Sequence, residues 1–404
     1  MSMDDDLVRR RLEPTLLELA SSFPVVTVTG PRQSGKTTLC RMAFPKLPYV
    51  SLENPDERRY ALEDPRGLLA ELTDGAVVDE VQRAPELLSY LQGMVDDDPR
   101  PGRFILTGSA NLALRADVPQ SLAGRTALLE LLPLDLEERA VLAPTEDLWQ
   151  VVWQGSYPAI HHRGVAADLW LRAYVATYLE RDLRQHLAVG DLNAFQGFLE
   201  LVAAHTGRIV NHTALGSAAG VSHNTSRSWL SVLEASYLVH LLPPLHRNLR
   251  KRVIKAPKMH LVDSGLACWL LGIRSSEELR RHPLRGAIFE SWVAAEVRKA
   301  LASRTVRVRL HHWRDQRGRE LNLVVDRGRD LVAVEVKSAA TVHASFFDAF
   351  GTFEELLREA VPAPENGVLG VVVYAGDRRQ QRTAGLLLPW SEIQSFAWDG
   401  THDD

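Results

Sequence analysis

One stretch decides the fold of the first part of the chain: Val25-Val26-Thr27-Val28-Thr29 runs directly into Gly30-Pro31-Arg32-Gln33-Ser34-Gly35-Lys36-Thr37. The apolar run predicts a buried strand, and a helix can begin at Lys36. The residues from Gly30 onward fit the pattern G-x-x-x-x-G-K-T. Its glycines let backbone N–H groups close around phosphate oxygens, and the helix N-terminus adds its positive dipole. The sequence therefore predicts a loop that binds the phosphates of ATP.

Each part of this loop has an expected role. We expect Lys36 to reach the β- and γ-phosphates and the Thr37 hydroxyl to ligate Mg²⁺. The alternative is a glycine turn that binds nothing, and the complete match between a strand and a helix argues against it. The predicted nucleotide-binding residues are Gly30, Pro31, Arg32, Gln33, Ser34, Gly35, Lys36, Thr37 and Thr38.

Two carboxylates end a second apolar run, Ala76-Val77-Val78-Asp79-Glu80. Adjacent charges at the tip of a buried strand are costly unless a metal or a substrate needs them. We expect Asp79 to hold Mg²⁺ and Glu80 to polarise the attacking water. A solvated acidic turn is the alternative interpretation.

Two further catalytic candidates have weaker signals. Ser109, with Asn111 as second choice, follows the apolar run Phe104–Leu106, where a sensor of the γ-phosphate is expected; simple strand-end polarity is the alternative. Arg125 precedes the next predicted strand, a position from which an arginine finger acts across a subunit interface. A surface arginine explains Arg125 equally well.

The composition bounds the remaining possibilities. At 404 residues the chain is long enough for two or three domains. A net charge of -4 gives no global attraction for nucleic acid, so DNA affinity must come from a local patch. The two cysteines, Cys40 and Cys268, form no ligand motif and suit a reducing cytosol. No signal peptide or membrane span is recognised, so we expect a cytoplasmic protein.

Apolar runs alternate with amphipathic stretches in the first part of the chain and again in the last, which predicts an α/β fold with a parallel N-terminal sheet. The predicted N-terminal strands are Val25–Thr29, Tyr49–Leu52, Ala76–Val78, Phe104–Leu106 and Ala127–Leu131. The predicted C-terminal elements are a helix at Phe289–Leu301 and strands at Arg307–His311, Leu321–Val325, Leu331–Val336 and Val368–Tyr374.

A helix–turn–helix is predicted in the middle of the chain. Its parts are Ala214–Ala219, the turn Gly220-Val221-Ser222 with Ser222 as N-cap, and a second helix over His223–Tyr237. Apolar residues would bury one face (Val221, Trp229, Leu230, Val232 and Leu233). Polar residues at the start of the second helix would stay exposed: His223, Asn224, Thr225, Ser226 and Arg227. Among these, Asn224, Thr225 and Arg227 are candidates for DNA contacts, unless the helical pair serves only packing.

A basic segment without acids follows this helical pair: Arg247, Arg250, Lys251, Arg252, Lys255 and Lys258. Such a run is often only a solvated face. Directly after a helix–turn–helix it also has the position of a wing that grips phosphate. Arg247, Arg250, Lys251 and Arg252 are therefore further candidates for DNA contacts.

The last part of the chain carries residues in the order of a PD-(D/E)XK nuclease. Glu290 fits the helix acid, and Glu335 and Lys337 fit the E-x-K pair that works with Mg²⁺. The metal-bridging aspartate is replaced by Asn322, and an amide is a poorer Mg²⁺ ligand than a carboxylate. Asp326 is a poor geometric substitute. We expect a domain that does not cleave, or an ordinary ion pair of Glu335 with Lys337.

Taken together, these motifs resemble the prokaryotic AAA-type ATPases that carry a C-terminal domain of unknown function, DUF4143. The resemblance covers nearly the whole chain. It rests on Leu52–Asp56, Leu62–Arg66, Val78–Gln82, Ser121–Arg125, Gln154–Pro158, Tyr178–Asp182, Leu233–Leu238 and Leu261–Ala267. It implies an ATPase module, a winged-helix module and a restriction-endonuclease-like C-terminal domain.

With this resemblance we divide the chain into four parts. These are an ATPase core (1–140), a helical lid or linker (141–194), a winged-helix-like module (195–258) and a restriction-endonuclease-like domain (259–404) that we expect not to cleave. The modules favour a homo-oligomer that uses Mg-ATP to bind or remodel DNA, branched DNA included. Two alternatives stay open: a signalling or regulatory NTPase that acts through protein partners, and an ATP-gated, metal-dependent nuclease.

Overall fold

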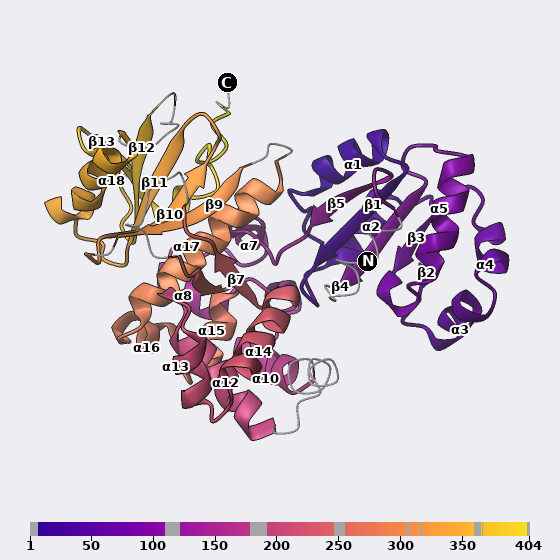
Figure 1. The fold of residues 1–404 in the computed structure, drawn as a ribbon, viewed down its shortest axis with the longest axis horizontal. Coiled ribbons are helices and arrows are strands. Elements are labelled where there is room, and N and C mark those ends of the chain that lie inside the picture. The colour runs from indigo at the N-terminus through magenta and orange to yellow at the C-terminus, as the bar shows by residue number, and fades with distance from the viewer. Residues whose placement is uncertain are drawn as a thin grey trace. The chain divides into compact units, whose positions relative to one another are not determined.

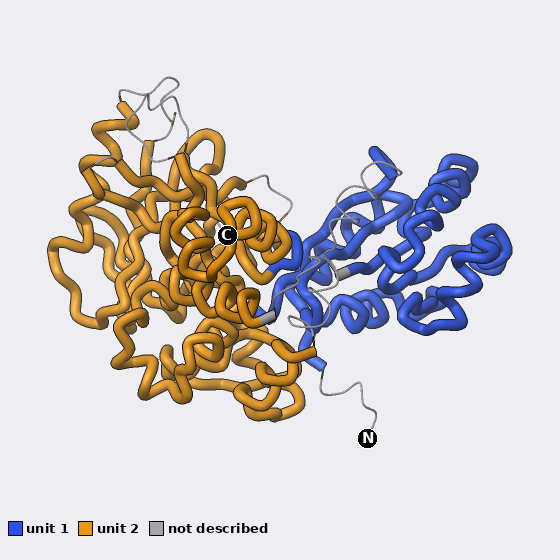
Figure 2. Tube along the Cα trace, turned by 60° about the horizontal axis from the view of Figure 1, so that its bottom comes forward, with its two compact units in different colours: residues 1–134, 235–237 blue, residues 135–234, 238–404 orange. Residues whose placement is uncertain are grey.

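The computed structural model describes residues 7–109, 122–177, 192–245, 255–304, 308–315, 317–358, 365 and 367–401. The chain forms two compact units, which we describe one at a time (Figure 2). Unit 1 comprises residues 1–134 and 235–237, and unit 2 comprises residues 135–234 and 238–404.

A five-stranded parallel sheet forms the centre of unit 1, in the order β2-β3-β4-β1-β5 (Figure 1). The five strands predicted from apolar runs are all present, with small shifts at their ends. They are β1 (Val25–Gly30), β2 (Tyr49–Ser51), β3 (Ala76–Asp79), β4 (Phe104–Ser109) and β5 (Thr126–Glu130). Continuous apolar runs suit these strands because both faces of the sheet are covered by helices.

Successive strand residues point to opposite faces of this sheet, and each face has its own core. Val25 and Leu106 pack with α3, α4 and α5, whereas Val26 and Ile105 pack with α1 and α2. The helices of unit 1 are α1 (Glu13–Ser22), α2 (Lys36–Ala43), α3 (Pro55–Glu63), α4 (Pro65–Glu71) and α5 (Leu87–Asp97), with a short 3-10 helix η1 (Val81–Arg83).

A six-stranded mixed sheet forms the C-terminal part of unit 2, in the order β13-β14-β12-β11-β10-β9. The strands β11, β12 and β14 run parallel, and the remaining neighbours are antiparallel. The four predicted strands are present among them. The bounds are β9 (Arg309–Arg314), β10 (Glu320–Asp326), β11 (Leu331–Lys337), β12 (Val368–Tyr374), β13 (Gln380–Arg382) and β14 (Gly385–Pro389).

Each face of this sheet carries a helix. α17 (Arg285–Ala302) packs on one face through Phe289, Val293 and Val297, and it begins earlier than the predicted Phe289. α18 (Asp348–Arg358) and η3 (Ala344–Phe347) pack on the other face. Another 3-10 helix, η4 (Trp390–Glu392), follows β14.

The rest of unit 2 is mainly helical (Figure 1). It includes a small antiparallel sheet in the order β6-β8-β7. The strands are β6 (Arg208–Ile209), β7 (Val239–Leu242) and β8 (Lys258–Leu261). The helices are α7 (Leu136–Leu142), α8 (Leu148–Gln154), α9 (Pro158–His162), α10 (Ala167–Tyr174), α12 (Leu192–Ala204), α13 (His212–Ala218), α14 (His223–Ala235), α15 (Ser264–Leu270) and α16 (Ser276–Arg281).

Two chain-wide properties complete the description. Both cysteines, Cys40 and Cys268, are buried and free. Among the described helices, none combines the length and the apolarity that a bilayer crossing requires.

Candidate functional site

The loop between β1 and α2 has the backbone that the sequence pattern predicts. Gly30 and Gly35 have φ angles of 147° and 94°, and α2 begins at Lys36. A Cβ atom on Gly30 would lie 2.1 Å from the carbonyl oxygen of Leu131, so only glycine fits there. Gln33 also has a positive φ, 66°. The loop thus turns sharply between the sheet and the helix N-terminus.

Lys36 points back over this loop. Its Nζ donates to the carbonyl oxygens of Gly30 and Pro31, at 3.2 and 2.8 Å. Burial lowers the pKa of Lys36, while the nearby carboxylates of Glu80 and Asp79 act in the opposite direction. The ammonium group is therefore placed inside the loop, next to both acids.

The remaining loop residues differ in exposure. Pro31 and Ser34 are buried, Arg32 is half-buried with an ion pair to Glu53 at 3.6 Å, and Gln33 and Thr38 are exposed. Within the described residues, Oγ of Ser34 is buried and has no hydrogen-bond partner.

Asp79 is the centre of the polar contacts at this end of the sheet. Its Oδ1 accepts from Oγ1 of Thr37 at 2.8 Å and from Oγ1 of Thr107, and its Oδ2 accepts from the hydroxyl of Tyr49 at 3.0 Å. These residues come from α2, β4 and β2, whose ends meet at the carboxyl edge of the parallel sheet. The structure thus brings together Thr37 and Asp79, the two residues predicted to hold Mg²⁺.

Glu80 follows directly in a strained backbone conformation, with a φ of 57°. Its backbone N–H donates to Oγ1 of Thr107 at 3.3 Å, and its carboxylate accepts from Nε2 of Gln82. Thr107 therefore contacts both acids, as donor to Asp79 and as acceptor from Glu80. The left-handed turn directs the chain from β3 into η1.

Sequence reasoning missed Thr107, Tyr49 and Gln82. Thr107 did carry a signal, because it is a fully buried hydroxyl inside an otherwise apolar strand, and such groups need a partner. Sequence reasoning also missed Arg10, which donates to the carbonyl oxygens of Ser34 and Leu132, both at 2.7 Å. Arg10 thereby ties the phosphate loop to the chain that leaves β5.

The two sensor candidates are only partly described. Ser109 is the last residue of β4 and pairs with Gly30 of β1, which places its backbone beside the loop. Nothing is described of its side chain, and Asn111 lies outside the described residues. Both assignments stay predictions.

Arg125 lies at the amino ends of the parallel strands, opposite to the end that carries the phosphate loop. Its carbonyl oxygen accepts from the N–H of Val25, at the start of β1, so about 20 Å of strand separates it from the loop of its own unit. Its guanidinium pairs with Asp96 of α5, at 2.9 Å between Nη2 and Oδ2. Arg125 can therefore act on a nucleotide only in another copy of the chain, and that role stays a prediction.

The predicted helix–turn–helix corresponds to α13, a turn at Gly220 with a φ of 70°, and α14. Oγ of Ser222 accepts from the N–H of Thr225 at 3.1 Å, which confirms the expected N-cap contact. Trp229 is buried against Phe195 and Phe198 of α12, in edge-on ring contacts.

The first turn of α14 differs from expectation at two positions. His223, Asn224 and Arg227 are exposed as predicted, and Thr225 is half-buried. Ser226 was expected to be exposed but is completely buried. The prediction was wrong because position 226 shares a helix face with Trp229 and Leu230, which point into the core.

The basic segment is described only at its end. Arg247, Arg250, Lys251 and Arg252 lie outside the described residues, and Lys255 is exposed. Lys258 is buried in β8, and its Nζ lies 2.5 Å from Oε1 of Glu290. Lys258 is therefore not a member of a solvent-exposed basic patch, because its charge is used inside unit 2.

The candidate nuclease residues lie near one another in unit 2. Glu290 belongs to α17, Asn322 to β10, and Glu335 and Lys337 to β11. Nζ of Lys337 lies 2.6 Å from Oε1 of Glu335. Burial raises the pKa of Glu290 to about 7, against the effect of Lys258, and it also raises the pKa of Glu335, against the effect of Lys337.

Asn322 has a structural contact that its sequence position did not reveal. Its Oδ1 accepts from the backbone N–H of Val336 at 2.8 Å, beside an irregularity in the pairing of β10. Asp326 lies at the far end of β10, where it accepts from the N–H of Gly328 at 2.9 Å. In the described part of the chain, no group of three acid, histidine or cysteine side chains is arranged to hold a metal ion.

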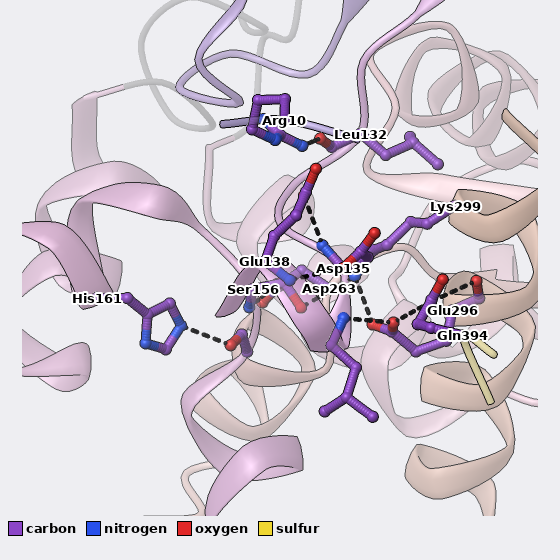
Figure 3. A network of polar contacts seen from close by, with 12 residues as sticks. Arg10, Leu132, Asp135, Glu138, Ser156, His161, Asp263, Glu296, Lys299 and Gln394 are labelled. Atoms are coloured by element: carbon purple, nitrogen blue, oxygen red, sulfur yellow. Dashed lines mark hydrogen bonds and ion pairs between the residues drawn. The ribbon is translucent and has the colours of Figure 1, made fainter. Parts of the chain in front are cut away.

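Two of the segments that carry the family resemblance, Gln154–Pro158 and Leu261–Ala267, meet in a buried polar network of unit 2 (Figure 3). Asp263 accepts from the N–H groups of Ser156 and Leu266, at 2.7 and 2.8 Å. Lys299 donates to Oγ of Ser156 at 3.0 Å and to Glu296 at 2.7 Å. These contacts hold α8, α15 and α17 together, so both motifs have a packing role.

The fold and the site of unit 1 define an AAA-type P-loop ATPase. Residues 22–140 match the family described as an AAA domain, and residues 145–277 and 285–393 match two domains of unknown function, DUF8612 and DUF4143. The uncharacterized proteins Mb2031c of Mycobacterium bovis and Rv2008c of Mycobacterium tuberculosis are each 34% identical to this chain over 337 residues. The match covers 82% of this chain and 74% of each relative.

The chain therefore belongs to the AAA-type P-loop ATPases that carry a C-terminal DUF4143 domain. Among solved structures, it is similar to the Walker-type ATPase PABY2304 of Pyrococcus abyssi, with 14% identity and a TM-score of 0.46. That similarity covers 66% of this chain and 97% of the other.

Proposed function

We propose that the chain hydrolyses ATP with Mg²⁺ and uses the energy to bind or remodel DNA, branched DNA included. The contact between Thr37 and Asp79, with Lys36 and Glu80 beside it, is the observation that supports the hydrolytic part. In this proposal Lys36 leaves the carbonyl oxygens of its own loop and binds the β- and γ-phosphates. Glu80 accepts a proton from the attacking water.

The donor set fits Mg²⁺. The hydroxyl of Thr37 and the carboxylate of Asp79 are hard oxygen ligands 2.8 Å apart, and they would hold the ion beside a bound nucleotide. Bound there, Mg²⁺ supplies positive charge for the phosphate oxygens. Ser34, whose buried Oγ has no hydrogen-bond partner among the residues that the structure describes, and the N-terminus of α2 favour a bound anion at the same place. Ser109 and Arg125 are the further catalytic candidates, Arg125 from a second subunit.

The DNA part rests on the order of elements in the middle of unit 2. The elements α12, β6, α13, α14, β7 and β8 follow one another, and their sheet order β6-β8-β7 supports the winged-helix interpretation. Asn224 and Arg227 are exposed on the first turn of α14, the helix that such a module presents to a DNA groove. Arg247, Arg250, Lys251 and Arg252 belong to the connection between β7 and β8, where a wing is expected.

The C-terminal domain completes the proposal as a non-cleaving, restriction-endonuclease-like part. Its candidate residues are close together, but the amide oxygen of Asn322 accepts from the backbone of Val336. In addition, Lys258 pairs with Glu290, and Lys337 pairs with Glu335. The four-part division at residues 140, 194 and 258 and the homo-oligomeric state belong to the same proposal.

A band-shift panel tests the DNA part. The purified chain is mixed with single-stranded, duplex, forked and four-way DNA, with and without Mg-ATP. We expect binding that depends on nucleotide and is weakened by Arg227→Ala, whereas the control Arg281→Ala, an exposed arginine of α16, leaves it unchanged. Binding to none of the four DNAs would favour the regulatory NTPase that acts through proteins. Cutting that is lost in Glu335→Ala would favour the gated nuclease.

A further inference from the structure

A lysine from outside the nuclease motif lies in the acidic cluster of unit 2. Nζ of Lys258 lies 2.5 Å from Oε1 of Glu290 and 3.9 Å from Oε1 of Glu320. Only 3% of the Lys258 side chain and 12% of the Glu290 side chain are exposed. Lysine is almost never buried without a partner, so the contact is part of how the domain is built.

The remaining polar groups of the cluster also contact the chain itself. Lys337 pairs with Glu335 at 2.6 Å, and the amide oxygen of Asn322 is bonded to the N–H of Val336. Glu320 additionally lies 3.6 Å from Nη1 of Arg314. The carboxylates that a nuclease of this architecture presents to a divalent ion are thus balanced by cationic side chains.

We propose that Lys258 takes the place of the divalent cation, so that the cluster is closed to metal by an internal ammonium group. This inference rests on the restriction-endonuclease-like reading of the domain, and goes beyond it by assigning metal exclusion to a residue of β8. From the sequence, Asn322→Asp looks sufficient to restore a metal ligand. Because Lys258 still contacts Glu290, Asn322→Asp alone does not allow a divalent ion to bind.

Charge and space decide whether the cluster can hold an ion. Removing one partner of a buried ion pair leaves an uncompensated charge, which is strongly destabilising. Lys258→Ala leaves Glu290 and Glu320 facing the space of the lost side chain. Carboxylate oxygens around a small cavity are suitable ligands for a hard divalent ion. A bound ion then restores stability, because it binds only the folded state.

The experiment measures Mn²⁺ binding and the melting temperature in the absence of nucleotide. Each variant is compared with the wild type, because the phosphate-loop site then contributes equally to both proteins. Free Mn²⁺ is followed by its EPR signal. We expect Lys258→Ala to bind one additional Mn²⁺ and to melt at a lower temperature that Mn²⁺ raises again. Adding Glu290→Gln should remove the additional ion. Lys255→Ala, an exposed lysine of the preceding connection, should change neither quantity.

The Asn322→Asp variant gives the sharpest comparison. We expect no additional Mn²⁺ with Asn322→Asp alone, and at least tenfold tighter binding when it is combined with Lys258→Ala than with Lys258→Ala alone. Mn²⁺ binding to Asn322→Asp that is lost on Glu290→Gln would overturn the proposal. A folded Lys258→Ala protein that binds no additional ion would overturn it as well.

Melting temperatures of single and double variants test the pairing even where Lys258→Ala folds poorly. If Lys258 and Glu290 compensate each other, the double variant Lys258→Met with Glu290→Gln should melt at a higher temperature than either single variant. Additive effects would contradict the pairing. None of these readouts uses DNA or ATP, so the proposal can fail while the proposed function stands, and the reverse is also true.

Discussion

The hydroxyl of Thr107 in β4 donates a hydrogen bond to Oδ1 of Asp79, at the end of the neighbouring strand β3. The same oxygen accepts the backbone N–H of Glu80 at 3.3 Å. One buried hydroxyl therefore orients both Asp79, the proposed Mg²⁺ ligand, and Glu80, the proposed base for the attacking water.

This contact predicts a positioning role for Thr107. Thr107→Val keeps the shape of the side chain and removes the bond to a charged group, which contributes about 1.5–3 kcal/mol. We expect kcat for ATP hydrolysis to fall roughly 10- to 100-fold, with little change in nucleotide affinity. Steady-state kinetics and calorimetric titration measure the two effects.

Thr27→Val is the matched control. Thr27 is also a buried strand threonine of the same sheet, but its hydroxyl contacts Oγ1 of Thr126 at 3.0 Å and no acid. Equal losses of turnover in the two variants would show that Thr107 acts only on stability.

A second prediction concerns Arg125, which pairs with Asp96 far from the loop of its own unit. If it acts in another subunit, Arg125→Ala should lower turnover by roughly 10³-fold or more and leave ATP affinity nearly intact. Mixing it with Lys36→Ala should restore part of the activity, since each variant lacks a different half of a shared site.

Arg100→Ala is the control for this pair, because Arg100 is another partly exposed arginine of unit 1 that pairs with an acid, Asp98. It should leave turnover unchanged. A strictly monomeric wild-type protein with full ATPase activity would exclude the role of Arg125 in a second subunit.

The third prediction concerns the expected wing. Neutralising Arg250, Lys251 and Arg252 together should weaken DNA binding on all sequences alike and flatten its salt dependence, because fewer counterions are released. The slope of log affinity against log salt concentration is the measurement. An unchanged affinity at low and moderate salt would favour a protein partner.

The fourth prediction is a pH dependence of stability. Burial lowers the pKa of His161 to about 4, helped by the charge of Arg139, and its Nε2 lies 2.9 Å from the carbonyl oxygen of Gly155. The unfolded chain binds a proton at this residue below pH ~6.5, whereas the folded chain does so only near pH 4. Stability is therefore complete above pH ~6.5 and falls as the pH drops toward 4, by up to about 3 kcal/mol.

Denaturant unfolding at pH 7 and pH 4.5 measures this loss. His161→Gln should reduce the difference between the two pH values, because glutamine does not titrate. His162→Gln is the control, since His162 is the next residue of α9 and is exposed. Equal pH dependence of wild type and His161→Gln would contradict the assignment.

Local patterns were sufficient to predict the strands, the turn of the phosphate loop and the position of Asp79 at the end of a buried strand, whereas the roles of the acids stay predictions. A buried parallel strand is a continuous apolar run, and G-x-x-x-x-G-K-T is contiguous, so β1, Lys36 and Asp79 could be predicted. The expected helix–turn–helix followed from the cap at Ser222 and the apolar face at Trp229.

Contacts between distant segments could not be predicted in the same way. Thr107 meets Asp79 because β3 and β4 are neighbours in the sheet, and Arg10 reaches Ser34 from the chain before α1. Lys258 looked like part of a basic run, and its burial depends on α17 lying against β8. Such pairings are set by the topology and not by the adjacent residues.

In the proposed hydrolysis, Asp79 and Glu80 have separate roles while Lys36 holds the ATP. The most direct measurement compares ATP binding and Mg²⁺-dependent hydrolysis in the wild type, Lys36→Ala and Glu80→Gln. We expect hydrolysis by the wild type, loss of binding in Lys36→Ala, and retained binding with turnover lowered by at least roughly 100-fold in Glu80→Gln. Hydrolysis by Glu80→Gln at the wild-type rate, or a wild type that binds no ATP, would contradict it.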